Sequence, residues 1–401
     1  MPSIPEISTV PPKLSDAFRS HPVHLRHECP DLTSLKELPD SYDWTHQHYV
    51  IPATNGDSAI SESIPVIDLN DPNALQLIGH ACKTWGAFQV INHGIPTSLL
   101  DQAECTTRHL FSLPVEQKLK ASRLPDALTG YGLSRSNSFF SKIMWSEVFT
   151  IIGSPLDHFR HLWPEDYTKH WGGRGPIAPP GFQNLIKNEV MEEYEKEMTK
   201  SAEKLMWLML GSLNITKEDI EWADPKGNIP DEFAVLHMNY YPACPNPDRA
   251  MGMAAHSDST ILTILHQNNT AGLQVLKKGT GWVAVPTNPG GLVVIVGDLL
   301  QILSNGSYIS ALHRAVVNRD KPRFSLPYFY GPPARAQVSP LPKLVGPSDP
   351  PLYRPITWSE FLGIKAKHFN NALSSIRICT SPPNEVVAAN GDNNTNSAEV
   401  A

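Results

Sequence analysis

The sequence predicts an α+β protein in which helices come first and a sheet-rich core follows. Two observations predict this. Before residue 226, apolar residues recur mainly at helical spacing, whereas from Glu232 the pattern changes to short apolar strands separated by Gly and Pro. Helices followed by strands are typical of α+β folds. Six or more short strands in succession favour a sandwich or a barrel, and a double-sheet jelly roll is one solution.

Residues 63–110 predict a strand, a helix, a second strand and a second helix. Asp71 and Pro72 are the residue types favoured at the N-cap and first position of a helix, and Gly86 is the type favoured just past its end. The second helix is expected after Pro96. The expected strands are Ser63–Asp68 and Ala87–Ile91.

The longest periodic segment, Asn184–Leu213, predicts a long amphipathic helix. Its apolar residues repeat at helical spacing, with Glu and Lys on the other face, so we expect it to pack against a sheet. We interpret its acidic residues as a solvated face rather than a metal cluster: Glu192, Glu193, Glu195 and Glu197.

The core after Glu232 is expected to contain seven strands, with a hairpin end at Gly279-Thr280-Gly281 and a helix over Ile356–Phe369. The expected strands are Phe233–Tyr241, Thr260–His266, Leu273–Leu276, Trp282–Val285, Leu292–Val296, Ala311–Val317 and Phe324–Tyr330.

Composition narrows the class of partner and the compartment. The formal net charge of −7, without any Lys/Arg run, argues against a nucleic-acid surface. No apolar stretch reaches the 18 or so residues of a membrane span. Five scattered cysteines suit a reduced intracellular protein, and the N-terminus lacks the pattern of a secretion signal. We therefore expect a cytoplasmic protein, and no protein partner is evident.

The most informative residues are His256 and Asp258, followed by His313. An i, i+2 pair on a strand points to one face. His313 comes 55 residues after Asp258, enough for further strands to bring it opposite. Two imidazoles and one carboxylate that leave metal positions open are the ligand set of non-haem Fe(II) oxygenases. Ten residues beyond His313, Arg323 and Ser325 form another such pair, and the guanidinium fork suits a carboxylate.

An interpretation without a metal competes with this one. A lone His-x-Asp is more often a surface turn or a hydrogen-bonded pair than a metal site. Three polar i, i+2 pairs in expected strands are harder to explain, because burying them costs free energy unless a metal or ligand pairs them. These pairs are Asn239/Tyr241, His256/Asp258 and Arg323/Ser325.

This constellation resembles the Fe(II)/2-oxoglutarate-dependent dioxygenases of plants. Two further segments, Trp85–Gly94 and Asn239–Pro242, are typical of the soluble plant branch of that family. The resemblance covers roughly residues 60–375 and implies a double-stranded β-helix (jelly-roll) core. One departure is Ser257, where relatives often carry Thr between the His and the Asp.

Longer strings outside the proposed iron site are similar to gibberellin 3-beta-dioxygenases. They discriminate between subfamilies better than the metal ligands do, because the ligands are shared by the whole family. These strings are Leu38–Trp44, Met144–Pro155, Gln267–Gln274, Leu344–Arg354 and Lys365–Asn370.

The resemblance implies 3β-hydroxylation of a C19 gibberellin to a bioactive hormone, with release of succinate and CO2. His256, Asp258 and His313 would hold Fe(II), and no catalytic residue beyond these ligands is expected. 2-Oxoglutarate and O2 would be co-substrates, with ascorbate in support. The residues implied for 2-oxoglutarate are Arg323, Ser325, Tyr241 and Asn239.

The implied substrate is a small diterpenoid acid. Pocket positions of related enzymes match Tyr131, Phe329 and Gly331, while Phe140 and Trp145 are candidates for further apolar wall. Because the substrate carries a carboxylate, a second cation near the pocket is expected. The candidates are Arg135 and Lys142, each interpreted in the first place as a solvated surface charge.

The implied regions are a Pro/His-rich extension (1–60), a mainly helical region (61–225), the jelly-roll catalytic core (226–345), a C-terminal helical segment (346–380) and a disordered tail (381–401). His21, His24 and His27 have helical spacing but no accompanying cysteine pair, so we interpret them as structural. Asn92-His93-Gly94 is interpreted as a turn.

Two alternatives remain open at this point. One is a sister dioxygenase that acts on another gibberellin position or on a flavonoid or alkaloid. The other is a non-catalytic jelly roll that binds a small molecule.

Overall fold

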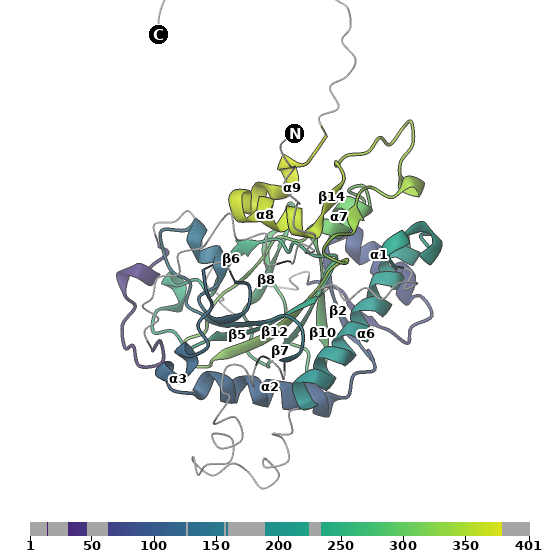
Figure 1. The fold of residues 1–401 in the computed structure, drawn as a ribbon. Helices are drawn as coiled ribbons and strands as arrows, with labels where there is room; N and C mark the ends of the chain where they lie inside the picture. The colour runs from purple at the N-terminus through teal and green to yellow at the C-terminus, as the bar shows by residue number, and fades with distance from the viewer. Residues whose placement is uncertain are drawn as a thin grey trace, which may run out of the picture.

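The computed structural model describes residues 14, 31–45, 63–125, 127–155, 158, 189–223 and 234–378. Within them, two sheets face each other and form a jelly roll, with helices on the outside (Figure 1). The expected α+β class and jelly-roll core are confirmed. The expected disordered tail and the histidines of the N-terminal extension lie outside the described residues.

The larger sheet has eight strands, in the order β1 (Val66–Asp68), β2 (Ala87–Ile91), β10 (Leu292–Val296), β7 (Leu262–Gln267), β12 (Arg323–Tyr330), β5 (Ala234–Tyr241), β4 (Glu147–Ile151) and β3 (Gly130–Gly132). The smaller sheet has the order β6 (Met253–His256), β11 (His313–Ala315), β8 (Leu273–Lys277) and β9 (Gly281–Ala284). A short ribbon pairs β13 (Gln337–Val338) with β14 (Ile356–Thr357). Apart from the parallel pair β1/β2, the pairs formed by these strands are antiparallel.

Helices cover the outer face of the larger sheet and one end of the roll (Figure 1). The α-helices are α1 (Ala74–Thr84), α2 (Thr97–Ser112), α3 (Val115–Leu119), α6 (Glu189–Gly211), α7 (Asp298–Leu303), α8 (Trp358–His368) and α9 (Ala372–Ser375). Short 3-10 helices are η2 (Asp40–Tyr42), η3 (Arg135–Phe139), η4 (Lys217–Asp219), η5 (Glu221–Ala223), η6 (Pro247–Arg249), η7 (Pro342–Leu344) and η8 (Phe369–Asn371).

Strand β5 shows how the larger sheet separates its two faces. Leu236 and Met238 are buried in the core beneath the helices, whereas their neighbours His237 and Asn239 face the space between the sheets. This alternation follows from the two-residue period of a strand. On β5, the outer face therefore joins the main hydrophobic core, and the inner face presents His237 and Asn239 to the space between the sheets.

Helix α6 packs against the larger sheet, as its periodicity predicts. Tyr194, Met198 and Met209 on its apolar face have no exposed surface, and the helix contacts β7 and β12. It is described from Glu189 to Gly211, so the first five residues of the expected helix lie outside the described part.

Several expected boundaries are wrong. The strand expected at Ser63–Asp68 is Val66–Asp68, the one expected at Ala311–Val317 is His313–Ala315, and the helix expected from Ile356 begins at Trp358, after the short strand β14. The first helix begins at Ala74 rather than beside Pro72, because the Asp71 carboxylate accepts a hydrogen bond from the Asn73 amide (2.7 Å) and holds a turn before the helix. Strand β6 ends at His256, so Asp258 lies in the loop that follows and not on the strand itself.

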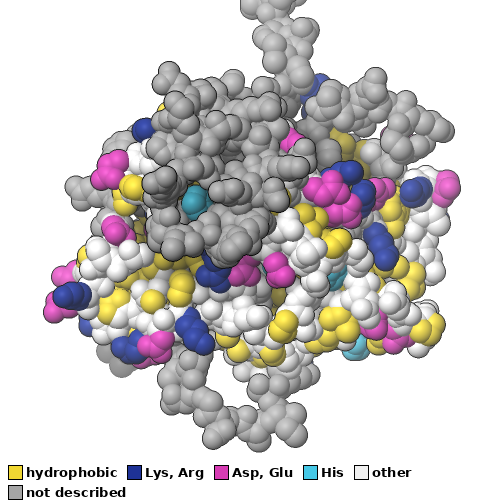
Figure 2. All heavy atoms as spheres, turned by 90° about the horizontal axis from the view of Figure 1, so that it is seen from below, with side chains coloured by type: hydrophobic (Ala, Val, Ile, Leu, Met, Phe, Trp, Pro, Cys, Tyr) yellow, Lys and Arg dark blue, Asp and Glu magenta, His cyan; other side chains and the backbone are white. Residues whose placement is uncertain are grey.

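The face seen from below in Figure 2 carries Lys/Arg and Asp/Glu side chains interspersed among apolar ones. On that face, mixed charge is what the modest net charge of the chain predicts. None of the described helices is both long and apolar enough to cross a bilayer.

Among the acidic residues of α6, we expect Glu195 to affect the pH dependence of stability most. It is half-buried, whereas Glu193 is exposed and pairs with Lys196 at 3.4 Å. Burial, with a contribution from Glu192, raises the pKa of Glu195 to about 7. Because the folded state holds this proton more strongly than the unfolded state, stability is lost as the pH rises from the ordinary carboxyl range through 7.

Glu195→Gln should therefore flatten the decline of the melting temperature between pH 5 and pH 8, since the amide has no proton to lose. Circular dichroism melts across this range measure it. Glu193→Gln, on the same helix but exposed, should keep the wild-type slope. Equal slopes for Glu195→Gln and the wild type would contradict the raised pKa.

Candidate active site

A cavity of about 260 Å³ lies between the two sheets. Its walls come from β5 and β12 of the larger sheet, from β6 and β11 of the smaller one, and from helix α8 at the end of the roll. Such a volume approaches that of small-molecule sites. The polar residue pairs singled out in the sequence all contribute side chains to it: Asn239, Tyr241, His256, Asp258, Arg323 and Ser325.

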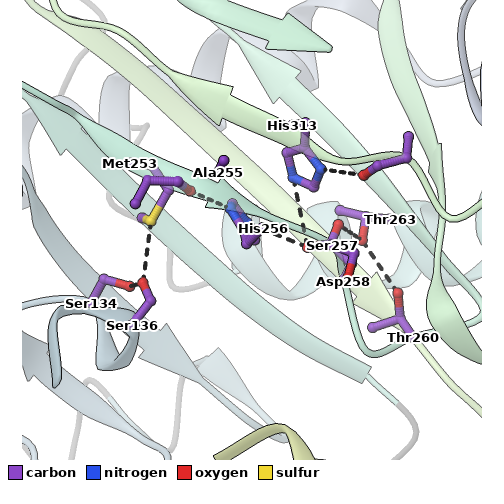
Figure 3. Close-up of polar contacts among 12 residues, drawn as sticks. Ser134, Ser136, Met253, Ala255, His256, Ser257, Asp258, Thr260, Thr263 and His313 are labelled. Carbon is purple, nitrogen blue, oxygen red and sulfur yellow. Dashed lines mark hydrogen bonds and ion pairs between the residues drawn. The ribbon is translucent and has the colours of Figure 1, made fainter. Parts of the chain in front are cut away.

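Three residues converge on one point of this cavity and are called the triad below: His256, Asp258 and His313 (Figure 3). The two histidines are direct cross-strand partners in the β6/β11 pair, although they are 57 positions apart in the chain. The Asp258 Oδ1 atom lies 3.6 Å from Nε2 of His256 and 3.7 Å from Nε2 of His313. One potential ligand atom from each residue lies within 4.8 Å of the others.

Backbone and side-chain hydrogen bonds orient the three donors. Nδ1 of His256 lies 2.8 Å from the Ala254 carbonyl, and Nδ1 of His313 lies 3.0 Å from the Ala311 carbonyl. A proton on each Nδ1 donates to the carbonyl and leaves the Nε2 lone pair for a metal. The Thr263 hydroxyl donates to Oδ2 of Asp258 at 2.7 Å, which leaves Oδ1 facing the imidazoles (Figure 3).

Charge states favour metal binding. Burial, and then the nearby imidazole of His313, lower the pKa of His256 to about 4, so this ring is neutral at pH 7. Burial would raise the pKa of Asp258, but the imidazoles of His313 and His256 and the Thr263 hydroxyl lower it overall. A neutral imidazole and an ionised carboxylate are the forms that bind cations.

These residues fit a ferrous ion. Nitrogen donors from two histidines and an oxygen donor from one aspartate match the ligand set of non-haem iron oxygenases, and the three donor atoms lie within 4.8 Å of one another. Asp258 and His313 are 4% and 6% exposed, so bulk water cannot hydrogen-bond to most of their polar atoms. A bound metal would compensate for this burial.

A lysine from the C-terminal helix braces the loop that carries Asp258. Lys365 of α8 donates to Ser257 and to the buried carboxylate of Asp298, both at 2.7 Å. The Asp298 amide in turn donates to the Asp258 carbonyl at 2.7 Å. Because Lys365 also lines the cavity, helix α8 is tied directly to the neighbourhood of the triad.

Arg323 and its neighbours form a second polar cluster. Tyr241 and Asn239 are the cross-strand partners of Arg323 and Ser325. The guanidinium donates to Gln267 at 2.7 Å and lies 5.1 Å from the centroid of the Tyr241 ring. Arg323 is 2% exposed, and burial lowers its pKa.

This cluster has unused hydrogen-bonding capacity. Nε of Arg323 and Oδ1 of Asn239 are buried without a hydrogen-bond partner, and no described carboxylate pairs with Arg323. Buried polar groups normally have partners, so an acidic ligand is the natural complement. Gly272 keeps room for the arginine, because a Cβ there would lie 2.8 Å from its Cδ atom.

Of the five residues expected at the substrate pocket, one lines the cavity. Phe329 lines the cavity and makes an edge contact with His237, with ring centroids 4.7 Å apart. Tyr131 lies on the opposite face of the larger sheet. It is paired with Phe149, and its hydroxyl donates to Glu147 at 2.6 Å, beside the Lys118 ammonium. The buried ion pair of Glu147 and Lys118 therefore holds the Tyr131 hydroxyl.

The remaining three candidates also lie outside the lining. Trp145 donates to the Pro242 carbonyl at 3.1 Å, and Phe140 packs on Trp44. Gly331 allows Trp358 to pack against the end of β12, because a Cβ there would lie 2.4 Å from the indole ring. The aromatic lining of this region comes instead from Phe139, which stacks on Phe369 with centroids 4.7 Å apart.

Of the two candidate cations for a substrate carboxylate, Arg135 lines the cavity, whereas Lys142 donates to the Asp40 carbonyl on the surface. His93 accepts from the Ile95 amide, and its other ring nitrogen lies 2.8 Å from the Gly290 carbonyl, which agrees with the expected role in a turn.

Sequence reasoning missed several residues that contact the site. Thr263, Lys365 and Gln267 were not predicted as site residues, although Gln267 and Lys365 begin two of the strings that indicate the subfamily. They reach the site through sheet register and the docking of α8. Gly272 gave a usable signal, since a glycine before an expected strand often marks a close approach of another group.

Two family models match the chain. Residues 232–332 match the 2OG-Fe(II) oxygenase superfamily, and residues 64–171 match the non-haem dioxygenase in morphine synthesis N-terminal family. The first match contains the triad and Arg323.

Curated relatives extend over nearly the whole chain. Gibberellin 3-beta-dioxygenase 1 of Pisum sativum is 54% identical over 391 residues, which cover 97% of this chain and 100% of the relative. Gibberellin 3-beta-dioxygenase 1 of Arabidopsis thaliana is 52% identical over 370 residues, which cover 92% of this chain and 99% of the relative.

Solved structures share the fold. The crystal structure of JOX2 in complex with 2OG, Fe and JA aligns with a TM-score of 0.67 and 32% identity, covering 86% of this chain and 95% of that one. The rice dioxygenase for auxin oxidation aligns with a TM-score of 0.62 at 24% identity, covering 79% of this chain and 100% of that one, and supports the fold alone. With near full-length identity above one half to a curated relative, the chain belongs to the 2OG-Fe(II) oxygenase superfamily and, within it, to the gibberellin 3-beta-dioxygenases.

Proposed function

We propose that this enzyme, a 2-oxoglutarate-dependent dioxygenase, hydroxylates C19 gibberellins at the 3β position and so produces bioactive hormone. The observation that carries the proposal is the 54% identity to a gibberellin 3-beta-dioxygenase over that protein's full length. The convergent triad and the arginine cluster support it, because a binding protein without turnover would have no need of both.

His256, Asp258 and His313 would hold Fe(II) through Nε2, Oδ1 and Nε2. When bound, the iron with 2-oxoglutarate and O2 supplies the oxidant: 2-oxoglutarate becomes succinate and CO2, and one oxygen atom enters the substrate as a hydroxyl group. The protein's part is to fix the ligands before the metal arrives. The carbonyls of Ala254 and Ala311 and the Thr263 hydroxyl do this.

Arg323 would bind the distal carboxylate of 2-oxoglutarate. Its guanidinium is held in place by Gln267, so little side-chain entropy remains to be lost when the anion binds. Ser325 and Tyr241 stand beside it on the same cavity wall and offer hydroxyl donors, and Asn239 offers an amide. Two parallel charge-assisted hydrogen bonds to one carboxylate would fix the orientation of the co-substrate.

The rest of the cavity would take the diterpenoid. Phe329, Phe139 and Leu362 give it apolar walls, which suit a fused-ring hydrocarbon skeleton and exclude water from the reacting carbon. We propose ascorbate as a supporting reductant. The cytoplasmic location and the absence of protein or nucleic-acid partners stay predictions from the sequence.

The first test is turnover by the purified enzyme. With Fe(II), 2-oxoglutarate and O2, a C19 gibberellin should gain one oxygen at the 3β position, and succinate should form in equal amount. Mass spectrometry and NMR identify the product. Hydroxylation at another gibberellin position, or turnover only with a flavonoid or alkaloid, would favour the sister-dioxygenase alternative. Binding without succinate formation would favour the non-catalytic one.

His256→Ala should abolish turnover and weaken Fe(II) binding by more than about 100-fold, because it removes a ligand rather than an outer partner. Calorimetric titration with Mn(II) as a stable substitute measures binding independently of activity. Thr263→Val keeps the shape but removes the hydrogen bond to Asp258, so a loss of about 10–100-fold in metal affinity is expected.

The matched control is His237→Gln, a histidine on the same cavity wall that does not belong to the triad. It should bind metal as the wild type does. Wild-type metal affinity in a folded His256→Ala protein would remove the ligand assignment.

Arg323→Lys should raise the KM for 2-oxoglutarate by roughly 10–100-fold, since one ammonium cannot reproduce the two parallel hydrogen bonds of a guanidinium. The KM for the gibberellin should change little. Steady-state kinetics with each substrate varied in turn measure both. An unaltered KM for 2-oxoglutarate would show that the anion binds elsewhere.

A further inference from the structure

Arg123 is a buried cation on the cavity wall that neither the metal triad nor the arginine cluster uses. It is 5% exposed and lines the cavity. Its backbone amide donates to the Tyr131 carbonyl at 2.9 Å, and Nη2 donates to the Leu133 carbonyl at 2.7 Å. These two bonds fix where the guanidinium lies without neutralising its charge.

No carboxylate among the described residues pairs with Arg123. Nε is buried without a hydrogen-bond partner, and the charged neighbour that acts on its pKa is another cation, Arg135. Burial, and then Arg135, lower the pKa of Arg123 to about 9, so it remains charged at pH 7. A buried charge without a counter-charge is costly, and its most direct compensation is an anion that enters the cavity.

The surroundings of Arg123 are positive or neutral. His237, on strand β5, has its pKa lowered to about 3 by burial and then by Arg123, so it is a neutral ring at pH 7. Arg135 also lines the cavity and donates to the carbonyls of Pro125 and Ala127. This end of the cavity therefore attracts anions rather than cations.

Arg123 and Arg323 lie near different positions along β5. Arg323 is opposite Tyr241, whereas the electrostatic partner of Arg123 on this strand is His237, four residues earlier. At about 3.3 Å per residue, these two positions are roughly 13 Å apart. A small dicarboxylate held at Arg323 and oriented toward the triad would therefore leave Arg123 without a partner.

The triad is within reach of a ligand held at Arg123. Asp258 and His256 are close enough to His237 to act on its pKa, as Arg123 does. The segment that accepts from Arg123 continues into Ser134 and Ser136, and the Ser136 hydroxyl contacts the Met253 sulfur of β6 at 3.6 Å (Figure 3). Arg123 and the metal-binding strand thus border the same part of the cavity.

We propose that Arg123 binds the carboxylate of the diterpenoid acid substrate and thereby sets which carbon faces the triad. This inference rests on the proposed function and adds the residue that recognises the acid group. Arg123 pairs with the carboxylate, the apolar walls hold the ring skeleton, and Arg323 remains dedicated to 2-oxoglutarate.

The experiment compares a C19 gibberellin with the methyl ester of its carboxylate, using wild-type enzyme with Fe(II) and 2-oxoglutarate and the variants Arg123→Gln and Arg123→Lys. The measured quantity is the ratio of kcat/KM for acid and ester. Because both substrates meet the same preparation, this ratio is independent of the fraction of folded enzyme. Dissociation constants for acid and ester, measured by calorimetry with Mn(II) in place of Fe(II), provide a readout without turnover.

The wild type should prefer the acid on the order of 100-fold, the usual effect of removing one partner of a buried charge pair. Arg123→Gln should reduce the ratio to near one by losing activity on the acid alone, and Arg123→Lys should retain an intermediate preference. The KM for 2-oxoglutarate should not change. As a matched control, Arg108→Gln removes an exposed arginine that pairs with Glu104, and it should leave the ratio at the wild-type value.

A wild-type preference that persists in Arg123→Gln would overturn the proposal. So would a wild-type enzyme that hydroxylates acid and ester equally well, and in that case the proposed function would stand. A wild-type enzyme that turns over 2-oxoglutarate but accepts no gibberellin in either form would remove the proposed function, and this inference with it.

Discussion

The pairing of β6 with β11 is the constraint on which the site depends. It sets His256 directly across from His313, so a single register brings together two ligands that are far apart in the chain. A slip of one residue would turn one imidazole to the other face of the small sheet. The two middle residues of the short β6 strand make further contacts: the Ala254 amide contacts the Met144 sulfur, and the Ala255 carbonyl accepts from Asn370 beside α8. The precision of the metal centre is therefore a property of the roll as a whole.

Charge burial divides the cavity into zones with different chemistry. The acid and imidazoles of the triad complement a cation, whereas Arg323 and Arg123 complement anions at two separated positions on the same wall. Backbone carbonyls orient the imidazole of His256 and the guanidinium of Arg123, and the side-chain amide of Gln267 orients Arg323. The free energy that folding loses by leaving these groups incompletely paired is recovered when ligands bind, which is how a preorganised site gains affinity.

Local patterns predicted much of this molecule. The strands Ala87–Ile91 and Leu292–Val296 have the expected bounds, since a short buried strand between turn residues leaves little ambiguity. The triad and Arg323 could be singled out because their residue types are costly to bury without a ligand. Family membership followed from long strings that lie outside the site.

Residues that reach the site through tertiary contacts could not be predicted in this way. Tyr131 matched a pocket position, yet it pairs with Phe149 on the far face of the sheet, while Val148, one residue earlier, faces the cavity. Which side a strand residue takes depends on register, and no local pattern of β3 fixes it. Arginine and lysine side chains usually lie on the surface. Arg123 and Lys365 line the cavity only because of how their segments dock.

The position of β10 in the larger sheet has a consequence for biosynthesis. This strand lies between β2 and β7, so residues 87–91 form their ladder with residues about two hundred positions later in the chain. During synthesis, the edges of β2 and β7 that pair with β10 lack their partner strand until Val296 has left the ribosome. Contacts this distant in sequence also delay folding, because the intervening chain must lose its entropy first. A nascent chain of this enzyme therefore carries exposed apolar strand edges through most of its translation, the condition under which chaperones are needed most.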